Sequence, residues 1–302
     1  MKYARICLSG CVAFLIVCVS MSSAVSEPLQ QKVLDEKCVF STILTVDDDG
    51  PADFSNISEA LAASSNGDMI FVYPGIYEEH SLEVDKSVSL VGSGAQQTVV
   101  VGENRADVLL VSSDGVLISN LSVVDTFRAV VSENCSMLSV VGCSFVEVFD
   151  GVYFDRGSGG VVQSCSFVNC SSGVFVGRSP NGSVKDSSFV GCSKGVYLEE
   201  SDDGMISDNV FEENEIGVYS SYAQRNVFSK NSFINNTRDV LAIVLFYKGR
   251  LWKNNFWQNN YWDTWIGVGV KVIWSALVVP INFVPIFLPW MQIDWNPAKQ
   301  PY

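Results

Sequence analysis

The chain has 302 residues, of which 48% are hydrophobic and 17% are charged, and its formal net charge is −14 at pH 7. So acidic a chain repels nucleic acid and anionic lipid, which argues against nucleic acid as a partner. The hydrophobic fraction is large enough to bury an extensive core, and one elongated domain is expected.

The N-terminus has the pattern of a secretory signal peptide. Lys2 and Arg5 precede an apolar run over residues 6–19, and small residues follow it. The run is shorter than the about 20 residues that a membrane span needs, so a retained anchor is the weaker alternative. We expect residues 1–24 to be a signal peptide and 25–40 a lead segment, with the mature protein secreted or at the cell surface or envelope.

A short strand and a capping helix are expected next. The apolar residues 43–46 predict a strand, which the acidic turn 47–51 ends. One helical face is formed by Phe54, Ile57, Ala60 and Leu61. We therefore predict a helix near 54–63, with Asp53 or Ser55 as N-cap. The acidic turn lacks the DxDxDG spacing of a calcium loop, and no metal is predicted there.

An apolar position recurs every 22 residues through most of the chain. Its members are Val123, Phe145, Phe167, Phe189, Phe211 and Phe233, followed after 23 residues by Phe256. Short apolar segments alternate with polar turn residues, which indicates strands. Three strands and three turns in about 22 residues make one coil of a parallel β-helix. We predict an all-β, right-handed, single-stranded parallel β-helix over 41–262.

Six cysteines follow the predicted signal peptide: Cys38, Cys135, Cys143, Cys165, Cys170 and Cys192. Cys143/Cys165 and Cys170/Cys192 occupy turn positions that later coils fill with asparagine: Asn209, Asn231 and Asn254, and Asn214, Asn236 and Asn259. Two interpretations stay open. Stacked side chains that point in parallel favour buried free thiols, whereas the coil spacing suits the Cα distance of a disulfide. Without CxxC spacing, a metal site is not predicted.

The segments VDDDGPADFSNISEAL, GDMIFVYPGIYEE and KSVSLVGSG resemble the opening of secreted right-handed β-helix proteins. These are the NosD-type family, also described as carbohydrate-binding and sugar-hydrolase (CASH) domains, and more distantly the pectinesterase fold. The late NNFWQNNYWDTW resembles their closing segment, so that the resemblance covers about residues 40–302. It implies a polysaccharide or surface glycan as partner. The NosD name implies copper, but a single histidine, His80, and no methionine cluster offer too few soft ligands. No cofactor or metal is predicted.

The catalytic motifs of related enzymes are missing from the sequence. Neither the QD pair and DFIFG segment of pectinesterases nor the NTD, GHG and RIK segments of polygalacturonases occur. One charged set provides candidate catalytic residues: Asp155, Arg156, Arg178, Glu199 and Glu200. Asp155 and Glu199 lie two coils apart, about 9.6 Å by strand spacing, which suits the two carboxylates of a glycosidase. Alternatively, these are surface charges that pair with neighbours and have no catalytic role.

Eight residues after the recurring position, a run of aromatic residues predicts a ligand-binding surface. Its members are Tyr153, Phe175, Tyr197 and Tyr219, between Val131 and Leu241. Strand alternation turns these side chains outward. They can form a platform for sugar rings, or they can be covered by another part of the chain.

The segment 266–290 is nearly all apolar and could provide such a cover. A membrane helix is the rival interpretation, but Pro280, Pro285 and Pro289 disfavour a helix. We expect 263–302 to be an extended segment that closes the β-helix, with a polar tail, and membrane association is not favoured.

Six sequons, at Asn56, Asn120, Asn134, Asn169, Asn181 and Asn235, are candidate glycosylation sites. The sequence as a whole predicts a carbohydrate-binding, adhesive or envelope module. The alternatives are a polysaccharide lyase or glycoside hydrolase that acts at the charged turn, and a purely structural envelope component.

Overall fold

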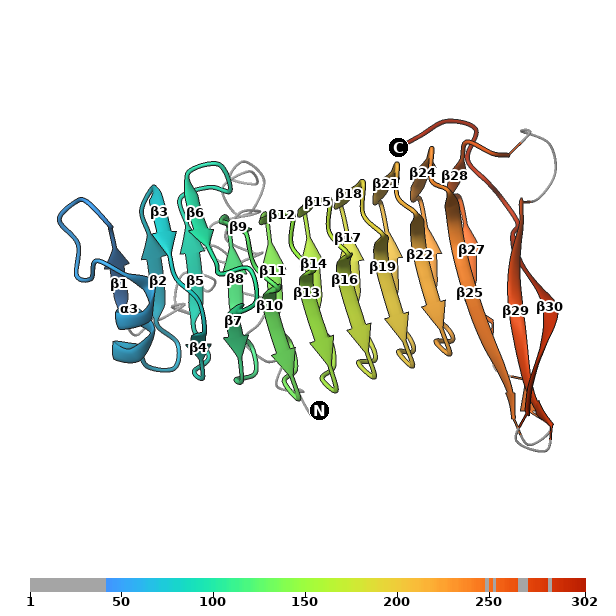
Figure 1. Cartoon of the computed structure of the whole chain (residues 1–302), viewed down its shortest axis with the longest axis horizontal. Coiled ribbons are helices and arrows are strands. Elements are labelled where there is room, and N and C mark those ends of the chain that lie inside the picture. The colour runs from blue at the N-terminus through green and yellow to red at the C-terminus, as the bar shows by residue number, and fades with distance from the viewer. Residues whose placement is uncertain (1–41, 248–249, 252–253, 266–270, 282–283) are drawn as a thin grey trace, which may run out of the picture.

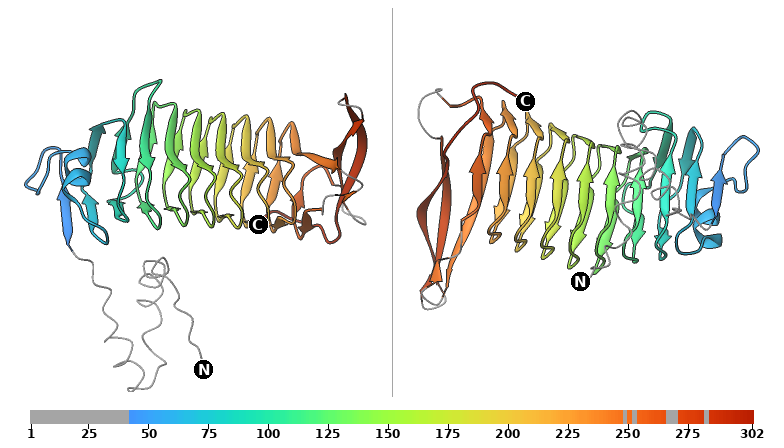
Figure 2. Two further views of the ribbon diagram at one scale, coloured as in Figure 1. Left: turned by 90° about the horizontal axis from the view of Figure 1, so that it is seen from below. Right: turned by 180° about the vertical axis from the view of Figure 1, so that it is seen from behind.

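The computed structural model describes residues 42–302, except for 248–249, 252–253, 266–270 and 282–283. The predicted signal peptide (1–24) and lead segment (25–40) lie outside the described residues, and both stay predictions. Within the described chain, short parallel strands stack coil upon coil into an elongated β-helix (Figures 1 and 2). The predicted all-β parallel fold is therefore confirmed.

Equivalent strands of successive coils pair in parallel and form three rows. Row 1 consists of β3 (Gly75–Glu78), β6 (Thr98–Val101), β9 (Ser122–Val124), β12 (Ser144–Val146), β15 (Ser166–Val168), β18 (Ser188–Val190), β21 (Val210–Glu212), β24 (Ser232–Ile234) and β28 (Tyr261–Trp262). Row 2 consists of β4 (Leu82–Val84), β7 (Asp107–Val111), β10 (Arg128–Glu133), β13 (Asp150–Asp155), β16 (Ser172–Gly177), β19 (Lys194–Glu199), β22 (Ile216–Ser221), β25 (Arg238–Tyr247) and β29 (Lys271–Ile281).

Row 3 begins at the N-terminal end of the β-helix and runs along its whole length. It consists of β1 (Ile43–Val46), β2 (Met69–Val72), β5 (Ser89–Gly92), β8 (Leu117–Ser119), β11 (Ser139–Val141), β14 (Val161–Gln163), β17 (Ser183–Lys185), β20 (Met205–Ser207), β23 (Val227–Ser229), β27 (Phe256–Gln258) and β30 (Val284–Asp294). A further short strand, β26 (Arg250–Leu251), pairs antiparallel with the end of β25.

The inward residues of row 1 form an aromatic ladder that fills the core. Its buried members are Phe145, Phe167, Phe189, Phe211, Phe233 and Trp262. Neighbouring phenylalanine rings lie 4.8–5.0 Å apart, the spacing that paired strands impose. Row 2 carries glycine opposite them, and a Cβ at Gly173 would lie only 2.5 Å from the Phe189 ring. The repeated phenylalanine therefore requires the repeated glycine.

The last coil departs from the predicted register. Trp262, and not Phe256, pairs and stacks with Phe233. Because β25 continues as far as Tyr247, equivalent residues of this coil are 29 positions apart instead of the predicted 23. Phe256 is displaced from the ladder, and its side chain is 60% exposed.

The predicted capping helix is present as α3 (Ile57–Ala63), but it begins later than predicted. Asn56 is the N-cap, and its side chain accepts a hydrogen bond from an amide of the first turn. The prediction of Asp53 or Ser55 is wrong, because Asp53 accepts hydrogen bonds from the amide and hydroxyl groups of Thr45 instead. The helix buries Ile57, Ala60 and Leu61 against the first coils.

Asparagine side chains link the later coils through the turns. In one ladder, the amide of Asn209 donates to Asn231 Oδ1, and the amide of Asn231 donates to Asn260 Oδ1. Each Nδ2 group also donates to a backbone carbonyl of a preceding coil. The prediction of Asn254 in this ladder is wrong, as is that of Asn259 in the second ladder, because Asn259 bonds to Asn296. Both errors follow from the longer last coil.

Four cysteines, Cys143, Cys165, Cys170 and Cys192, occupy the equivalent turns of the earlier coils. The five described cysteines, Cys135, Cys143, Cys165, Cys170 and Cys192, are buried free thiols, and Cys38 lies outside the described residues. Cys165 Sγ, for example, lies 3.3 Å from the carbonyl oxygen of Gln163. Burial raises the pKa of the Cys143 thiol well above its ordinary value. Of the two interpretations, the structure shows free thiols.

The C-terminal segment ends the stack as a long antiparallel hairpin of β29 and β30. β29 also pairs in parallel with β25, and the hairpin stands beside the last coils in Figure 1. Ile273 and Leu277 are buried, whereas Leu288 and Met291 are exposed. The described part of the apolar segment is thus extended. None of the helices in the described ranges is long and apolar enough to cross a membrane.

Candidate functional site

The outward side chains of row 2 form a continuous column, and its aromatic members Tyr153, Phe175, Tyr197 and Tyr219 are called the stripe here. They lie in register with one another, between Val131 and Leu241. All four are half-buried, whereas the side chains before and after them on their strands are buried. The predicted outward orientation is therefore confirmed.

The rings of the stripe are not oriented alike. Tyr153 and Phe175 stack face to face, with centroids 4.6 Å apart and an interplanar angle of 9°. Phe175 and Tyr197 meet edge to face at 87°, and Tyr197 and Tyr219 are tilted by 32°. Stacked rings cover one another's faces, so Tyr153 and Phe175 present mainly their edges. Tyr197 and Tyr219, whose centroids lie 4.7 Å apart, also cover part of each other's faces, so the four rings differ in the edges and faces that they present.

The described part of the C-terminal segment does not cover the stripe. β29 is the next strand of row 2 after β25, so it lies beyond Leu241 instead of over Tyr197 (Figure 2). Of the two interpretations of the stripe, the described residues therefore favour a solvent-facing surface over a structural seam.

Two charged side chains, Lys194 and Glu199, contact Tyr197 of the stripe. Lys194 Nζ lies 5.6 Å from the centroid of Tyr197, within the range of a cation–π contact. The Tyr197 hydroxyl lies 3.3 Å from Glu199 Oε1, to which it donates. Burial, together with the Glu199 carboxylate, raises the pKa of Tyr197, so the hydroxyl stays protonated. The Tyr197 ring therefore has an amine over its face and a carboxylate at its hydroxyl end.

The predicted charged turn is organised around Asp155, which is only 3% exposed. Arg178 donates three hydrogen bonds of 2.7–3.0 Å to its carboxylate, and Arg156 Nε lies 3.0 Å from Oδ2. Both oxygens of Asp155 are thus engaged. Glu199 and Glu200 take the equivalent positions two coils later, where Glu199 contacts Tyr197 and Glu200 is exposed. The structure brings Asp155, Arg156 and Arg178 into one clamp, which Glu199 and Glu200 do not join.

Glu133, at the end of β10, lies between two guanidinium groups. Its Oε1 is 3.8 Å from Arg128 Nη1, and its Oε2 is 3.8 Å from Arg156 Nη2. Both distances exceed that of a hydrogen bond. Arg128 is fixed by Asp107, through Nε–Oδ1 and Nη2–Oδ2 bonds of 3.0 and 2.6 Å. Its guanidinium carbon lies 4.8 Å from the Tyr153 centroid, so this cluster adjoins the stripe.

Two open clefts lie at the ends of the stripe. The N-terminal cleft has a volume of about 600 Å³, and its lining includes Glu83, Leu110, Arg128, Val131, Glu133 and Asn134. The C-terminal cleft, of about 410 Å³, lies between the first residues of β25 and β29, where Asp239 Oδ2 is 3.8 Å from Lys271 Nζ. Burial raises the pKa of Asp239, and Lys271 partly opposes this effect.

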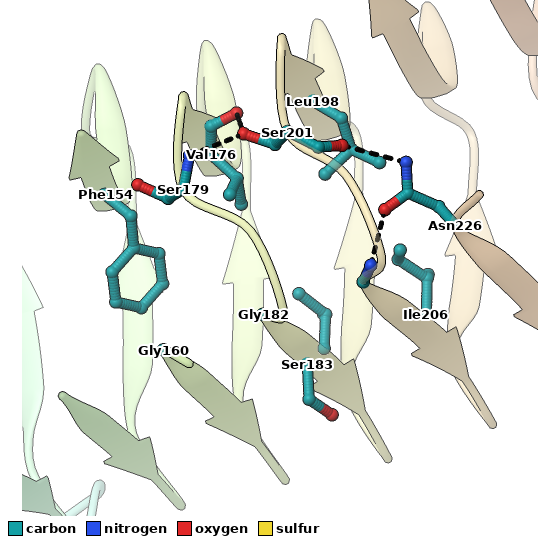
Figure 3. A pocket seen from close by; sticks show the side chains of 12 residues that line it. Phe154, Gly160, Val176, Ser179, Gly182, Ser183, Leu198, Ser201, Ile206 and Asn226 are labelled. Carbon is teal, nitrogen blue, oxygen red and sulfur yellow. Dashed lines mark hydrogen bonds between the residues drawn. The ribbon is translucent and has the colours of Figure 1, made fainter. Parts of the chain in front are cut away.

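A third opening is a narrow crevice at the corner between rows 2 and 3 (Figure 3). It holds about 20 Å³, which is the space of about one water molecule. Three of its four polar side chains, Ser179, Ser201 and Asn226, already bond within the turn ladders. This crevice is too small for a sugar and is not a candidate site.

Sequence reasoning missed Glu133, Arg128 and the exposed rings beside them. Glu133 shares a register position with Asp155, so extending the charged column by one coil would have found it. Phe127 and Phe149 precede two strands of row 2 and stack with centroids 4.7 Å apart. Both are exposed, and their recurrence 22 residues apart was the available signal.

Five of the six predicted sequons lie on exposed turns. Asn120, Asn134, Asn169, Asn181 and Asn235 all have φ between 53° and 61°. Asn56 differs, because it is half-buried and its side chain caps α3. An exposed turn leaves room for a glycan, and glycosylation of these residues stays a prediction.

Comparison with known proteins assigns the chain to a family. The family model described as "Periplasmic copper-binding protein (NosD)" matches residues 61–267. The chain belongs to the NosD family. The predicted resemblance is thereby confirmed, and the description of the family as periplasmic indicates an extracytoplasmic location for this NosD protein.

Several enzymes share the fold of this NosD protein at low sequence identity. An alginate lyase from Paenibacillus sp. is 15% identical, with a TM-score of 0.58 over 74% of this chain and 88% of the lyase. The catalytic unit of an α-1,3-glucanase from Streptomyces thermodiastaticus is 14% identical, with a TM-score of 0.55. The match covers 76% of this chain and 45% of the glucanase chain. At these identities, the likeness concerns the fold alone.

A probable pectinesterase/pectinesterase inhibitor from Arabidopsis thaliana shares a shorter stretch. It is 40% identical over 77 residues, which are 22% of this chain and 13% of the plant protein. The match therefore spans a small part of that relative.

The described residues do not fit a copper site. Copper takes imidazole, thiolate or thioether ligands that converge on one point. His80 lies on the surface beside Glu103, at 3.6 Å, whereas the described thiols are buried among backbone carbonyls of the coils. Within the part of the chain described, the side-chain group that could hold an ion is Asp47, Asp48 and Asp49, which offers only oxygen.

Proposed function

We propose that this NosD protein binds a polysaccharide along row 2 of the β-helix. The observation that carries the proposal is the stripe, four half-buried aromatic rings in register on a solvent-facing sheet. The Tyr197 ring is turned by 87° from Phe175, and the half-buried Tyr197 and Tyr219 supply apolar aromatic surface that suits a sugar ring. Lys194 and Glu199 supply a donor and an acceptor for hydroxyl groups beside them.

Binding without turnover is the form of this function that the geometry supports best. Both oxygens of Asp155 are engaged by arginines, so the carboxylate is directed to these side chains instead of to a substrate. The likeness of the fold to an alginate lyase and an α-1,3-glucanase supports a carbohydrate ligand. A secreted binding module of this kind suits an adhesive role in the cell envelope.

A glycan array with the mature protein, followed by titration of the best ligand, tests the proposal. We expect Tyr197→Ala and Tyr219→Ala to weaken binding about three- to tenfold each, through loss of aromatic contacts. Tyr73→Ala is the matched control, because Tyr73 is an exposed tyrosine outside the stripe. Absence of binding to any glycan, or an equal loss in the control, contradicts the proposal. Release of new reducing ends or unsaturated products supports the enzyme alternative at Asp155 instead.

A further inference from the structure

The N-terminal cleft holds a carboxylate that is near two arginines without bonding to either. A charge-assisted hydrogen bond spans about 2.7–2.9 Å. Glu133 lies 3.8 Å from Arg128 on one side and from Arg156 on the other. On each side, a carboxylate oxygen of Glu133 and a guanidinium nitrogen lie next to each other without forming a hydrogen bond, so both can bond to a ligand.

The two arginines are held in place by other carboxylates. Asp107 binds Arg128 through two nitrogens, and Asp155 binds Arg156 while it is itself fixed by Arg178. Neither guanidinium can close on Glu133 without breaking these bonds. The two guanidinium groups are therefore positioned before a ligand arrives, whereas the exposed Glu133 side chain can rotate between them.

The floor of the cleft is apolar. Leu110 and Val131 lie in the same outward column as Tyr153 and line the cleft, where Leu110 is half-buried and Val131 is only 4% exposed. The Val131 side chain extends less far from the sheet than the Tyr153 side chain. The cleft is thus a hollow at the N-terminal end of the stripe, continuous with it.

We propose that the N-terminal cleft is the end subsite of the stripe and binds one neutral sugar residue through two adjacent hydroxyl groups. One hydroxyl donates to Glu133, and its neighbour accepts from Arg128. This inference rests on the proposed function and names the class of glycan, a neutral polysaccharide with a free vicinal diol at this residue.

The charge of the cleft selects against uronic acids. Arg128, Arg156 and Arg178 are balanced by Asp107, Glu133 and Asp155, and Glu83 adds a carboxylate with no ion pair to the described residues. No excess positive charge remains for the carboxylate of a uronate. Hydroxyl groups, in contrast, can use both the donor and the acceptor.

Affinity electrophoresis of the mature protein tests this inference. The gels contain β-glucan, galactomannan or polygalacturonate at equal mass. We expect at least one neutral polysaccharide to retard the protein more than polygalacturonate does, with little dependence on salt. Glu133→Gln should weaken that retardation about tenfold, because the charged acceptor is lost. Glu78→Gln on row 1 is the control, because it makes the same change of charge at an exposed glutamate elsewhere.

The outcomes separate the inference from the proposed function. Stronger retardation by polygalacturonate, or unchanged affinity in Glu133→Gln while Tyr197→Ala binds weakly, overturns the neutral end subsite and leaves the stripe as binding surface. If no polysaccharide retards the wild type, both the proposed function and the end subsite are contradicted. Circular dichroism of each variant establishes that a lost affinity reflects the site, since Glu133 is exposed and its replacement should not disturb folding.

Discussion

Arg178 donates three hydrogen bonds to Asp155, a residue on the preceding coil. The carboxylate is buried, whereas the Arg178 side chain is about half exposed. Asp155 also holds Arg156, which faces Glu133 across the rim of the N-terminal cleft. A buried acid thus orders a row of surface arginines, and the charged turn is a support for the site next to it.

Asp155→Asn should therefore destabilise the fold and loosen the arginine that Asp155 holds beside the N-terminal cleft. The amide keeps the shape but loses its charge and one acceptor, which costs about 1–3 kcal/mol. Urea unfolding gives this value, and Glu200→Gln in the exposed equivalent turn serves as control. If both variants unfold at the wild-type urea concentration, Asp155 does not act as an anchor.

The aromatic ladder makes a second prediction. Phe189 is inaccessible to solvent and stacks between Phe167 and Phe211, so Phe189→Ala should cost about 3–5 kcal/mol through lost burial and a cavity. Phe149→Ala is the matched change at a ring that is 48% exposed, and its cost should be far smaller. Chemical denaturation compares the two. A loss below about 1 kcal/mol for Phe189→Ala contradicts the assigned core.

The turn ladders predict that cysteine and asparagine are interchangeable at one position. Asn214 Oδ1 already accepts the amide of Cys192, and the Cys192 thiol points to the carbonyl of Phe167. Cys192→Asn can use the same carbonyl and extend the asparagine ladder, so the melting temperature should hold or rise. Aspartate has the size of asparagine but no side-chain N–H donor, so Cys192→Asp should have a lower melting temperature than Cys192→Asn. Equal destabilisation by both substitutions shows that the position requires a thiol.

Asp239 makes stability depend on pH in a defined direction. Burial raises its pKa in the folded chain, so the folded state binds this proton more tightly than the unfolded state does. The stability that this group contributes is therefore greatest at acidic pH and declines as pH rises from about 3.9 through the folded pKa. Asp239→Asn should stabilise the protein at neutral pH, with an advantage that fades below about pH 4. Unfolding measured across this range checks the sign, and an advantage that does not vary with pH contradicts it.

Much of the fold follows from the repeat, because each coil must place an equivalent residue in the same slot of the core. The ladder from Phe145 to Phe233 and the outward register of the stripe were predictable for this reason. The last coil was not, since Phe256 fits the repeat by type, while the extension of β25 lets Trp262 fill the slot instead.

The candidate site was less predictable than the fold, because its geometry depends on contacts between coils. The spacing of Asp155 and Glu199 suggested two free carboxylates, but side-chain direction commits Asp155 to arginines. Likewise, Asp53 is drawn away from the helix start by Thr45, eight residues earlier. Spacing along the chain predicts which residues of successive coils stack on one another. It does not predict which neighbouring group each side chain bonds to.

Hydroxyl-radical footprinting of the stripe tests the central claim most directly. The protein is oxidised with and without the polysaccharide that it binds best, and modification is quantified at each tyrosine by mass spectrometry. We predict that Tyr197 and Tyr219 become protected, while the exposed control Tyr73 is modified equally in both samples. Unchanged oxidation of Tyr197 and Tyr219, with protection at another surface of the β-helix, would show that the glycan does not bind along the stripe.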